Sequence, residues 1–443
     1  MQKYVKTKPD KSIIHFKHLK CNYICLLLVF TVFFLWGCSN IPEKDQIQES
    51  VKQHVSDSEP ADFVEEQQSS LSENQPIHTS DSEEFSESFL SEKDCTDIAP
   101  EPETLSITMV GDILLHTPVE RAALQEDGSY CYEAIFTNLK DDIAAADLAI
   151  VNQEVILGGE ELGVSGYPAF NAPFTVGDAL VEAGFDVICH GTNHALDKGR
   201  KGLLNCISFW EEQYPEIGVL GIHDSQESQD NIYIYEQNGI KVAVLNYTYG
   251  TNGIPLPEDM PYAVDLLQEE QVIQDIQLAE ELADFTIVCP HWGTEYQLVW
   301  SSSQEKWAKI FAENGVDLVI GTHPHVIQPI EWIMDEATGH EMLVYYSLGN
   351  FVNWTSESGT GIANRMVGGM AQVTLVREED EVRIAEYNVE PVVCHLEQGV
   401  NGVTVYKLAE YTEELAQRNE IRHQDAAFSL EYCEKLCEEV WSK

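Results

Sequence analysis

Basic residues are scarce in this sequence. The 443 residues include 25 lysines and arginines against 75 aspartates and glutamates, which gives a formal net charge of −50. Proteins that bind nucleic acid through its backbone need clustered lysine and arginine side chains to neutralise the phosphates. The charge balance therefore argues against that class of partner, and we expect no nucleic acid to bind.

Cysteine and long apolar runs are also in short supply. The 11 cysteines are too sparse for a small scaffold held by disulfides, and their spacing shows no C-x-x-C metal-binding pair. No stretch reaches the ~18–20 apolar residues of an ordinary transmembrane helix. Hydrophobic residues nevertheless make up 44% of the chain, which is ample for a packed core.

The N-terminus has the pattern of a secretion signal. Six lysines lie within the first 20 residues, and the 14-residue apolar run Tyr23–Trp36 follows them. Gly37-Cys38 then resembles a bacterial lipobox, in which a small residue precedes the lipidated cysteine. We therefore expect a lipoprotein signal peptide over 1–38, lipidation at Cys38 and a position on the extracytoplasmic face of the cell membrane. Trp36 departs from the lipobox pattern and leaves an uncleaved signal anchor as the alternative.

The next segment has the composition of a linker. Residues 39–103 contain 18 acidic and three basic residues, and their apolar residues have no period. Such a segment buries too little surface to fold, and its like charges keep it extended. We expect an acidic disordered linker over 39–103, a folded domain over 104–395 and a helical C-terminal extension over 396–443.

Within the folded domain, strand patterns alternate with helix patterns, which indicates an α/β core. A hairpin is expected around Asn238-Gly239. A late run of strands predicts a second, partly antiparallel sheet. The expected strands are 105–110, 148–151, 185–189, 232–235, 241–246, 285–289, 318–320, 342–347, 371–376 and 382–389, and the main expected helices are 136–146, 174–183, 199–213, 266–282, 304–314 and 405–439.

Five of these strands end in side chains that suit metals. The residues are Asp112, Glu154, Asn193 with His194, His291, and His323 with His325. In open α/β sheets, ligands bind outside the carboxyl ends of the strands. Mixed oxygen and nitrogen ligands suit Mn, Fe or Zn better than Ca. A bridging carboxylate would let two such divalent cations activate one water between them.

The order of these motifs along the chain resembles that of the calcineurin-like metallophosphoesterases. The residues within the motifs resemble those of the CapA family of poly-γ-glutamate capsule synthesis proteins. The matching phrases are Val110-Gly-Asp-Ile-Leu-Leu115, Asn152-Gln-Glu154, Asn193-His-Ala-Leu-Asp197-Lys-Gly199, His291-Trp-Gly-Thr-Glu295-Tyr296, Gly321-Thr-His-Pro-His-Val-Ile-Gln328 and Tyr346-Ser-Leu-Gly-Asn350-Phe-Val352. The resemblance covers roughly 104–395. It implies a metallophosphoesterase-like α/β fold, a two-sheet sandwich flanked by helices in four layers, α/β/β/α.

The resemblance also implies roles for the polar residues. The first metal would take Asp112 and His325, the second would take Asn193, His291 and His323, and Glu154 would bridge the two. His194 would be the general acid that protonates the leaving group, a role that suits an imidazole with a pKa of ~6.5.

Two positions depart from the family pattern. The Asp-x-His block lacks its histidine because Leu114 occupies that place, and His116 would have to substitute from the loop. Glu154 stands where the bridging residue is usually aspartate, and its longer side chain could change the metal spacing.

Three further residues could belong to the site. Glu295 is either a partner of His291 or a surface carboxylate, and Asp197 either orients His194 or caps a helix. Asn350 follows a strand and could line the site.

Two functions of different kinds follow from the resemblance. One is a metal-dependent hydrolase or transferase of capsule or poly-γ-glutamate biosynthesis, acting on an anionic polymer or its phosphorylated precursor. The other is a non-catalytic lipoprotein scaffold that supports polymer synthesis or export alongside capsule synthesis and export proteins. Leu114 favours the scaffold, whereas the Asn193-His194 pair favours the enzyme.

The net charge of −50 disfavours the binding of a polyanion. Bound cations or a local basic patch would have to supply the attraction. The nearest cationic side chains along the sequence are Lys198, Arg200 and Arg365, and solvation at the surface is the role expected of them.

Overall fold

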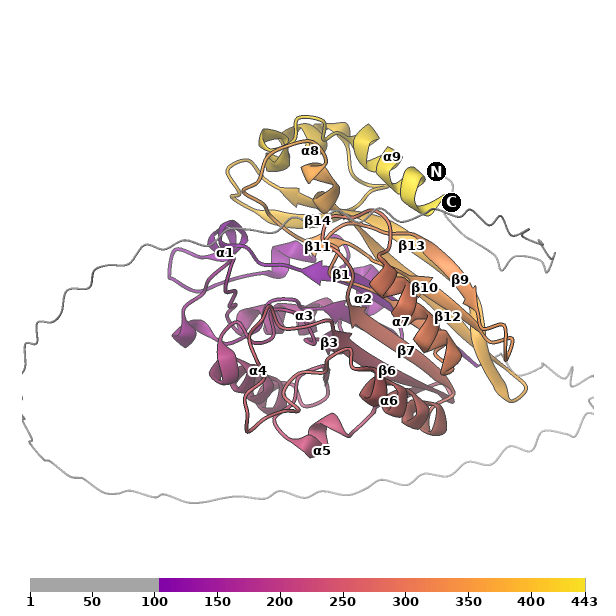
Figure 1. Cartoon of the computed structure of the whole chain (residues 1–443). Helices are drawn as coiled ribbons and strands as arrows, with labels where there is room; N and C mark the ends of the chain where they lie inside the picture. Colours follow the sequence, from indigo (N-terminus) through magenta and orange to yellow (C-terminus); the bar gives the residue numbers. More distant parts are fainter. Residues whose placement is uncertain (1–102, 443) are drawn as a thin grey trace, which may run out of the picture. The chain divides into compact units, whose positions relative to one another are not determined.

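The computed structural model describes residues 103–442 (Figure 1). The predicted signal peptide, the lipidation site Cys38 and the acidic linker up to residue 102 lie outside the described residues. Within residues 103–442, no helix combines the length and the apolar character needed to cross a membrane.

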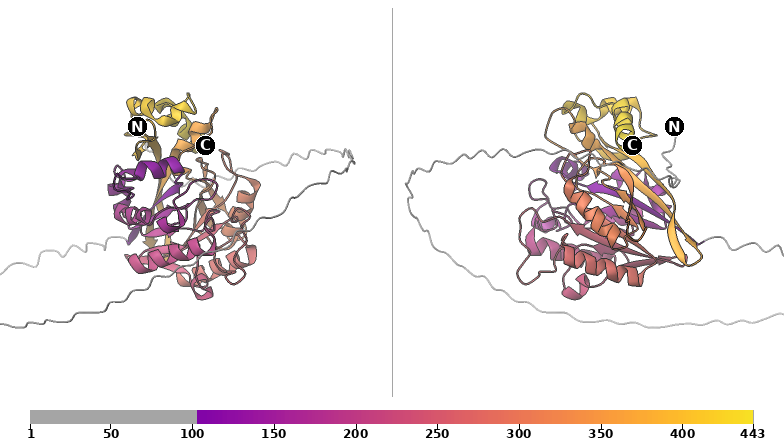
Figure 2. Two further views of the ribbon diagram at one scale, coloured as in Figure 1. Left: turned by 90° about the vertical axis from the view of Figure 1, so that its left-hand side faces the viewer. Right: turned by 45° about the vertical axis from the view of Figure 1, so that its right-hand side comes forward.

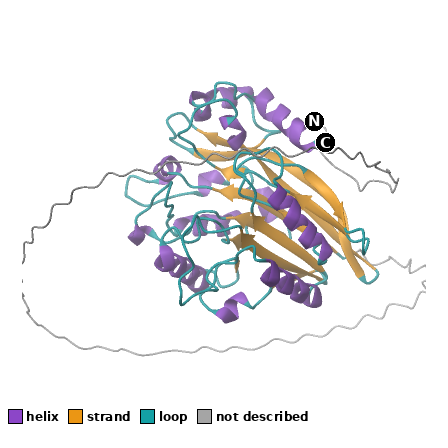
Figure 3. Cartoon of the chain, viewed as in Figure 1, coloured by secondary structure: helices purple, strands orange, loops and turns teal. Residues whose placement is uncertain are grey.

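Two mixed sheets form the framework (Figure 3). The first sheet has the order β14 (Val403–Lys407), β13 (Glu381–Leu396), β12 (Val367–Glu378), β1 (Thr104–Ile113), β2 (Leu148–Asn152), β3 (Val187–Cys189) and β4 (Gly218–Leu220), with β11 (Asn350–Val352) also paired to β1. The second has the order β5 (Tyr233–Gln237), β6 (Ile240–Thr248), β7 (Phe285–His291), β8 (Leu318–Ile320), β10 (Glu341–Tyr345) and β9 (Ile330–Met334). Strands β1 to β4 run parallel, as do β6, β7, β8 and β10, while β12 to β14, β5 and β9 pair antiparallel.

The helices cover the sheets. They are α1 (Thr117–Ala123), α2 (Lys140–Ala144), α3 (Thr175–Ala183), α4 (Gly199–Gln213), α5 (Gln226–Gln229), α6 (Glu269–Leu282), α7 (Ser302–Glu313), α8 (Glu413–Arg418) and α9 (Leu430–Trp441). Short 3-10 helices lie at η1 (Glu133–Ile135), η2 (Glu160–Leu162), η3 (Ile362–Met366) and η4 (Glu420–His423).

The sheets and helices build four layers. The inner faces of both sheets share one core, in which the sulfur of Cys289 on β7 lies 3.6 Å from that of Met109 on β1. Helices α6 and α7 pack on the outer face of the second sheet and form a separate core with it. Helices α3 and α4 join successive parallel strands of the first sheet, and right-handed crossovers place both on one face. The predicted α/β class with two sheets and flanking helices is confirmed.

Local predictions were accurate where the sequence pattern was strong. Strands β5 and β6 form the expected hairpin, and Asn238 and Gly239 have φ angles of 54° and 77° at its turn. Both central residues of a type I′ turn require such positive values.

Two stretches differ from the predictions. The helix expected over 136–146 is reduced to α2, preceded by the 3-10 helix η1. Residues 403–407, which overlap the helix expected over 405–439, form strand β14 instead and pair with β13, with Val403 and Val405 buried. Tertiary pairing has overridden the local helical preference there, whereas α8 and α9 follow as helices (Figure 2).

A close backbone approach joins β1 to the loop before β11 at the edge that carries the polar residues. A side chain on Gly111 would place its Cβ 1.9 Å from the carbonyl oxygen of Gly349, so only glycine fits. The backbone N–H of Asp112 donates to that same oxygen at 3.0 Å. Glycine at this position therefore lets the chain carry Asp112 directly against the next loop.

Candidate metal centre

Two buried carboxylates form the middle of the site. Asp112 and Glu154, at the ends of β1 and β2, are both 0% exposed. Asp112 accepts a hydrogen bond from the Asn152 amide at 2.8 Å and one from the backbone N–H of His323 at 3.2 Å. Both oxygens of Glu154 lack a hydrogen-bond partner among the described residues. A buried carboxylate without donors is costly, so Glu154 needs either a proton or a cation.

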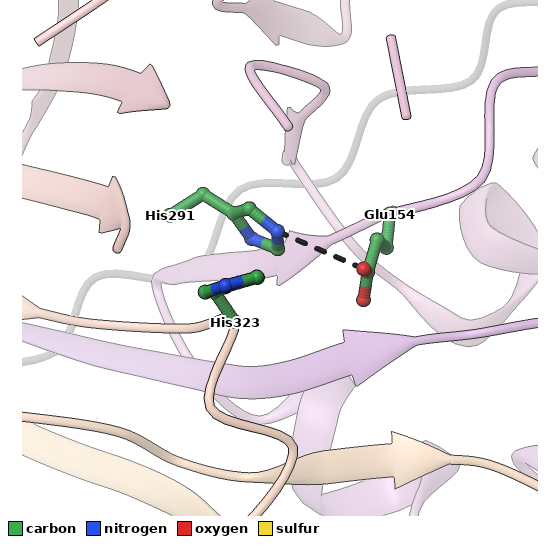
Figure 4. A group of neighbouring side chains, drawn as sticks. All are labelled: Glu154, His291 and His323. Atoms are coloured by element: carbon green, nitrogen blue, oxygen red, sulfur yellow. Dashed lines mark ion pairs between the residues drawn. The ribbon is translucent and has the colours of Figure 1, made fainter. Parts of the chain in front are cut away.

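Three histidines surround these carboxylates. His291 ends β7, and its Nε2 lies 3.7 Å from Glu154 Oε1 while its Nδ1 lies 3.8 Å from Asp112 Oδ1. His325, in the loop after β8, has Nδ1 3.3 Å from Asp112 Oδ2 and Nε2 3.7 Å from Glu154 Oε1. Figure 4 shows the side chains of Glu154, His291 and His323 turned toward one another, with the His291–Glu154 ion pair dashed.

The ligand atoms fall into overlapping groups. Those of Glu154, His291 and His323 lie within 4.8 Å of one another, and so do those of Asp112, Glu154 and His325. Glu154 belongs to both groups. A carboxylate shared by two sets of nitrogen and oxygen donors is the arrangement that a pair of bridged cations requires.

The loop after β8 adopts an unusual backbone conformation to present its histidines. His323 and His325 have φ angles of 95° and 57°, in the left-handed region that non-glycine residues rarely adopt. Such strain persists where surrounding structure enforces it, and it is concentrated at functional sites. The Gly321-Thr-His-Pro-His motif therefore has a geometric role in addition to supplying donors.

The ionisation of these groups differs across the site. Burial, followed by the neighbouring histidines, lowers the pKa values of His291 and His323 well below the usual imidazole range. Burial acts in the same direction on His325, but the carboxylates of Glu154 and Asp112 outweigh it and raise the pKa of His325 to about 9. Burial raises the pKa of Glu154 well above its usual range. Neutral His291 and His323 are in the form that binds metals.

Asn193 and His194 extend the site from the loop after β3. Asn193 Oδ1 lies 2.8 Å from His291 Nε2, beside the group that contains His323. His194 Nδ1 donates to Asp197 Oδ2 at 2.7 Å, which leaves Nε2 3.9 Å from Glu154 Oε1. Asp197 also accepts the backbone N–H of Phe170 at 2.7 Å, and the N-cap of α4 is the next residue, Lys198. Asp197 therefore orients His194 in this structure.

The structure also places the remaining candidates. Asn350 Oδ1 lies 3.0 Å from His325 Nδ1, so Asn350 supports that ring. Glu295 is exposed, and its ligand atom groups with those of His323 and His325. The nearest polar partners of His291 are Asn193 at Nε2 and Thr322 at Nδ1.

His116 belongs to none of the ligand groups found within residues 103–442. Its ring packs edge-on against Phe170, with 5.1 Å between centroids, just before α1. Burial, with His325 and His194 nearby, lowers the pKa of His116 to about 3. Leu114, in the place of the missing imidazole, is itself buried.

Sequence reasoning missed two asparagines. Asn152 donates to Asp112 and lies 3.4 Å from His291 Nδ1. Asn252 contacts both Asn193, at 3.3 Å, and His194, at 3.4 Å. A signal was present for Asn252, because it follows strand β6 in a Thr-Asn-Gly sequence at the same kind of strand end as the other site residues.

The polar atoms left without partners test whether a cation fits. Among the described residues, both Glu154 oxygens, Nδ1 of His323 and Oδ1 of Asn152 are buried and have no hydrogen bond. All are electron-pair donors or, for the imidazole, become one when deprotonated. Carboxylate, imidazole and amide oxygen together form a donor set that divalent transition metals accept. The residues therefore fit a metal centre.

The sequence of this chain is similar to those of capsule synthesis proteins. The family model described as "Bacterial capsule synthesis protein PGA_cap" matches residues 106–355. The chain is 28% identical over 274 residues to "Capsule biosynthesis protein CapA" of Bacillus anthracis, covering 58% of this chain and 62% of that protein. It is 26% identical over 259 residues to "PGA biosynthesis protein CapA" of Bacillus subtilis (strain 168), covering 57% and 65%. The aligned region thus spans less than two thirds of either relative.

Solved structures that align with this chain include phosphoesterases. "Calcineurin-like phosphoesterase YfkN" from Bacillus subtilis aligns with a TM-score of 0.38 and 14% identity, over 75% of this chain and 99% of that one. A 5′-nucleotidase precursor from Thermus thermophilus aligns with a TM-score of 0.42 and 14% identity, over 66% and 54%. Because the family model matches more than half of the chain, this protein belongs to the bacterial capsule synthesis protein family PGA_cap.

Proposed function

We propose that this protein is a dimetal hydrolase or transferase of capsule biosynthesis that acts on an anionic polymer, such as poly-γ-glutamate, or on its phosphorylated precursor. The observation that carries the proposal is the buried carboxylate of Glu154, which lacks hydrogen bonds to the described residues and belongs to two groups of metal-binding side chains. The names of both Bacillus relatives refer to capsule or PGA biosynthesis, which supports the choice of pathway.

Six side chains would hold the cations, which we expect to be Mn, Fe or Zn. They are Asp112 and His325 on one side, Asn193, His291 and His323 on the other, and Glu154 between them. Bound there, the cations would supply an activated water and stabilise negative charge on the substrate. The chain's own contribution is a buried frame that fixes these donors before substrate arrives.

His194 is assigned the proton transfer. Its Nδ1–H donates to Asp197, which fixes the tautomer with Nε2 directed toward the side of the site that contains Glu154. The ring is held further by Phe170, whose centroid lies 4.6 Å away in an edge-on arrangement. In the imidazolium form the ring holds a second proton, on Nε2, and this is the proton that would pass to a leaving group bound at the metal centre.

The scaffold function remains a second candidate because one observation favours it. Leu114 replaces an imidazole of the family pattern, and His116 joins no ligand group within residues 103–442. The Asp112 side therefore has one donor fewer than the pattern provides. In either case we propose a lipid anchor at Cys38, an extracytoplasmic position and association with capsule synthesis or export proteins.

Metal content and turnover, measured together, test the proposal. Purified full-length protein should contain divalent metal and hydrolyse an activated phosphodiester or γ-linked glutamate polymer. His323→Ala should lose metal and activity in parallel. His423→Ala is the matched control, since His423 has a 71% exposed side chain on η4 and pairs with Glu420. Protein that binds no Mn, Fe or Zn would refute the metal centre, while metal binding with no turnover of either substrate would favour the scaffold.

A further inference from the structure

One cationic side chain lies beside the metal centre and is shielded from solvent. Arg365, in η3, has a side chain that is only 9% exposed, which corrects the solvated position expected from sequence. Asn350 connects it to the site, because the Asn350 amide donates to the carbonyl oxygens of Arg365, at 3.0 Å, and His325, at 3.1 Å. Arg200, by contrast, is 55% exposed as expected.

Tyr296 positions the guanidinium of Arg365. The Cζ atom of Arg365 lies 3.5 Å from the centroid of the Tyr296 ring, a cation–π contact. The same ring lies 5.9 Å from that of His325. Tyr296 has a φ of 65° and donates its backbone N–H to the carbonyl of Pro324 at 2.7 Å. A strained tyrosine thus contacts both a predicted metal ligand and the buried cation.

The guanidinium is paired with a carboxylate from a surface loop. Nη2 of Arg365 lies 2.6 Å from Glu357 Oε2, and Nη1 donates to the Thr355 hydroxyl at 3.2 Å. The Glu357 side chain is 61% exposed. A buried guanidinium is costly to leave without an anion, whereas an exposed carboxylate returns to water at little cost. An anion from solution can therefore take the place of Glu357.

The backbone on both sides of Glu357 is fixed by the C-terminal segment. Asp425 accepts the backbone N–H of Gly361 at 2.9 Å, and the N–H of Gly359 donates to the Gln424 carbonyl at 3.0 Å. The Gln424 amide donates to the Thr355 carbonyl at 3.3 Å. Displacement of Glu357 therefore requires rotation of its side chain and no unfolding of the loop.

We propose that Arg365, resting on Tyr296, binds a carboxylate group of the substrate, and that Glu357 occupies this position until the substrate carboxylate displaces it. The ligand class follows from the present partner of Arg365, because the guanidinium already pairs with the carboxylate of Glu357. The planar guanidinium can also donate two parallel hydrogen bonds to the two oxygens of a carboxylate. The inference rests on the proposed function, because it assigns Arg365 to the substrate of the same centre. It also gives a protein of net charge −50 a local attraction for an acidic chain.

Two probes that differ only in charge test the proposal. One is a γ-linked glutamate oligomer, and the other is the same oligomer with its α-carboxylates converted to amides. Calorimetric titration of metal-loaded full-length protein should show that Arg365→Gln weakens binding of the acid about 10- to 100-fold, as expected for a lost charge-assisted hydrogen bond. Binding of the amide should not change. Glu357→Gln should strengthen binding of the acid, because the competing carboxylate is gone.

A second ion pair provides the matched control. Arg383 and Glu378 form an exposed pair on the β12–β13 hairpin, with side chains 52% and 57% exposed. Arg383→Gln and Glu378→Gln should leave both titrations unchanged. Arg365→Lys keeps the positive charge but loses the planar guanidinium, so it should bind the acid with intermediate affinity. Thermal melts should show that all variants fold.

The outcomes separate the two proposals. Equal weakening of acid and amide by Arg365→Gln, weaker binding of the acid by Glu357→Gln, or no binding of the acid by the wild-type chain would each overturn the carboxylate site. So would a larger effect of Arg365→Gln on inorganic phosphate than on the acid. These results leave the metal content and turnover of the wild type as a separate measurement, on which alone the proposed function depends.

Discussion

On one side of Glu154 the ligand atoms come from His291 and His323, and on the other side from Asp112 and His325. The first side has neutral imidazoles, because burial and the neighbouring histidines lower their pKa values, and Nδ1 of His323 has no partner within residues 103–442. Asn193 adds an oxygen there. On this side Nδ1 of His323 is ready for a cation, whereas His291 must first give up a hydrogen bond, to Asn193 at Nε2 or to Thr322 at Nδ1.

On the Asp112–His325 side, the ligand groups already pair with neighbouring residues. Asp112 already accepts hydrogen bonds from Asn152 and from the backbone of His323. The carboxylates raise the pKa of His325 to about 9 despite its burial, so a proton occupies the ring at neutral pH. A cation on this side must displace that proton, and Leu114 offers no replacement donor. We therefore expect two unequal metal sites, with the His291–His323 side the tighter.

The largest expected effect is on turnover and comes from His194, whose Nε2 lies 3.9 Å from Oε1 of the shared carboxylate Glu154. His194→Ala should retain metal and fold, because His194 is in none of the ligand groups found within residues 103–442, and it should lower turnover about 10²- to 10⁴-fold. The loss should be smaller for substrates whose leaving group needs no proton. Steady-state kinetics at matched metal loading measure it, and equal rates for both proteins would remove His194 from the mechanism.

Glu154 should influence both sites at once. Glu154→Gln should reduce metal content on both sides and remove the stabilisation by bound metal, ~2.7 kcal/mol at a metal concentration of 100 Kd. In chelator the order of stability should reverse, and Glu154→Gln should be more stable than the wild type. Metal-free Glu154 must either take up a proton on folding or stay charged without a partner, whereas the amide is neutral and incurs neither cost. Thermal melts with and without chelator test this. A variant less stable than the wild type in chelator would show that the Glu154 charge is stabilising without metal.

The strand ends and the positions of the ligand-bearing loops could be predicted from sequence, because apolar strand patterns and short motifs are local signals. Asp112, Glu154 and His291 lie at the ends of such strands, and the structure brings both carboxylates within 4 Å of the His291 ring. The burial of Arg365 could not be predicted. It depends on Tyr296, from a distant part of the chain, and on a loop fixed by Asp425, and these contacts are set by tertiary packing.

The stability of the metal-free protein should depend on pH through His325, on the Asp112–His325 side of the centre. His325 has a folded pKa of about 9 against a reference of 6.5, so the folded state binds a proton that the unfolded state lacks. Its contribution to the free energy of unfolding is complete below the reference value and is lost as pH rises through about 9. Metal affinity on the Asp112 side should rise over the same interval. Two-site Mn titrations and chelator melts at several pH values measure both, and a pH-independent weaker site would contradict the assignment.

The smallest expected effect is that of His116→Ala. His116 lies outside the ligand groups of residues 103–442 and packs on Phe170, so its removal should leave two-site metal binding unchanged. Since Phe170 in turn contacts His194, a decrease in turnover of no more than about tenfold is expected from loosened packing, in line with the ~0.5–1.5 kcal/mol of a lost aromatic contact. Metal titration and kinetics on the same preparation separate the two effects. Loss of the weaker metal alone would show that His116 completes the Asp112 side when the cation binds, and the two sides of Glu154 would then be more alike than their metal-free geometry indicates.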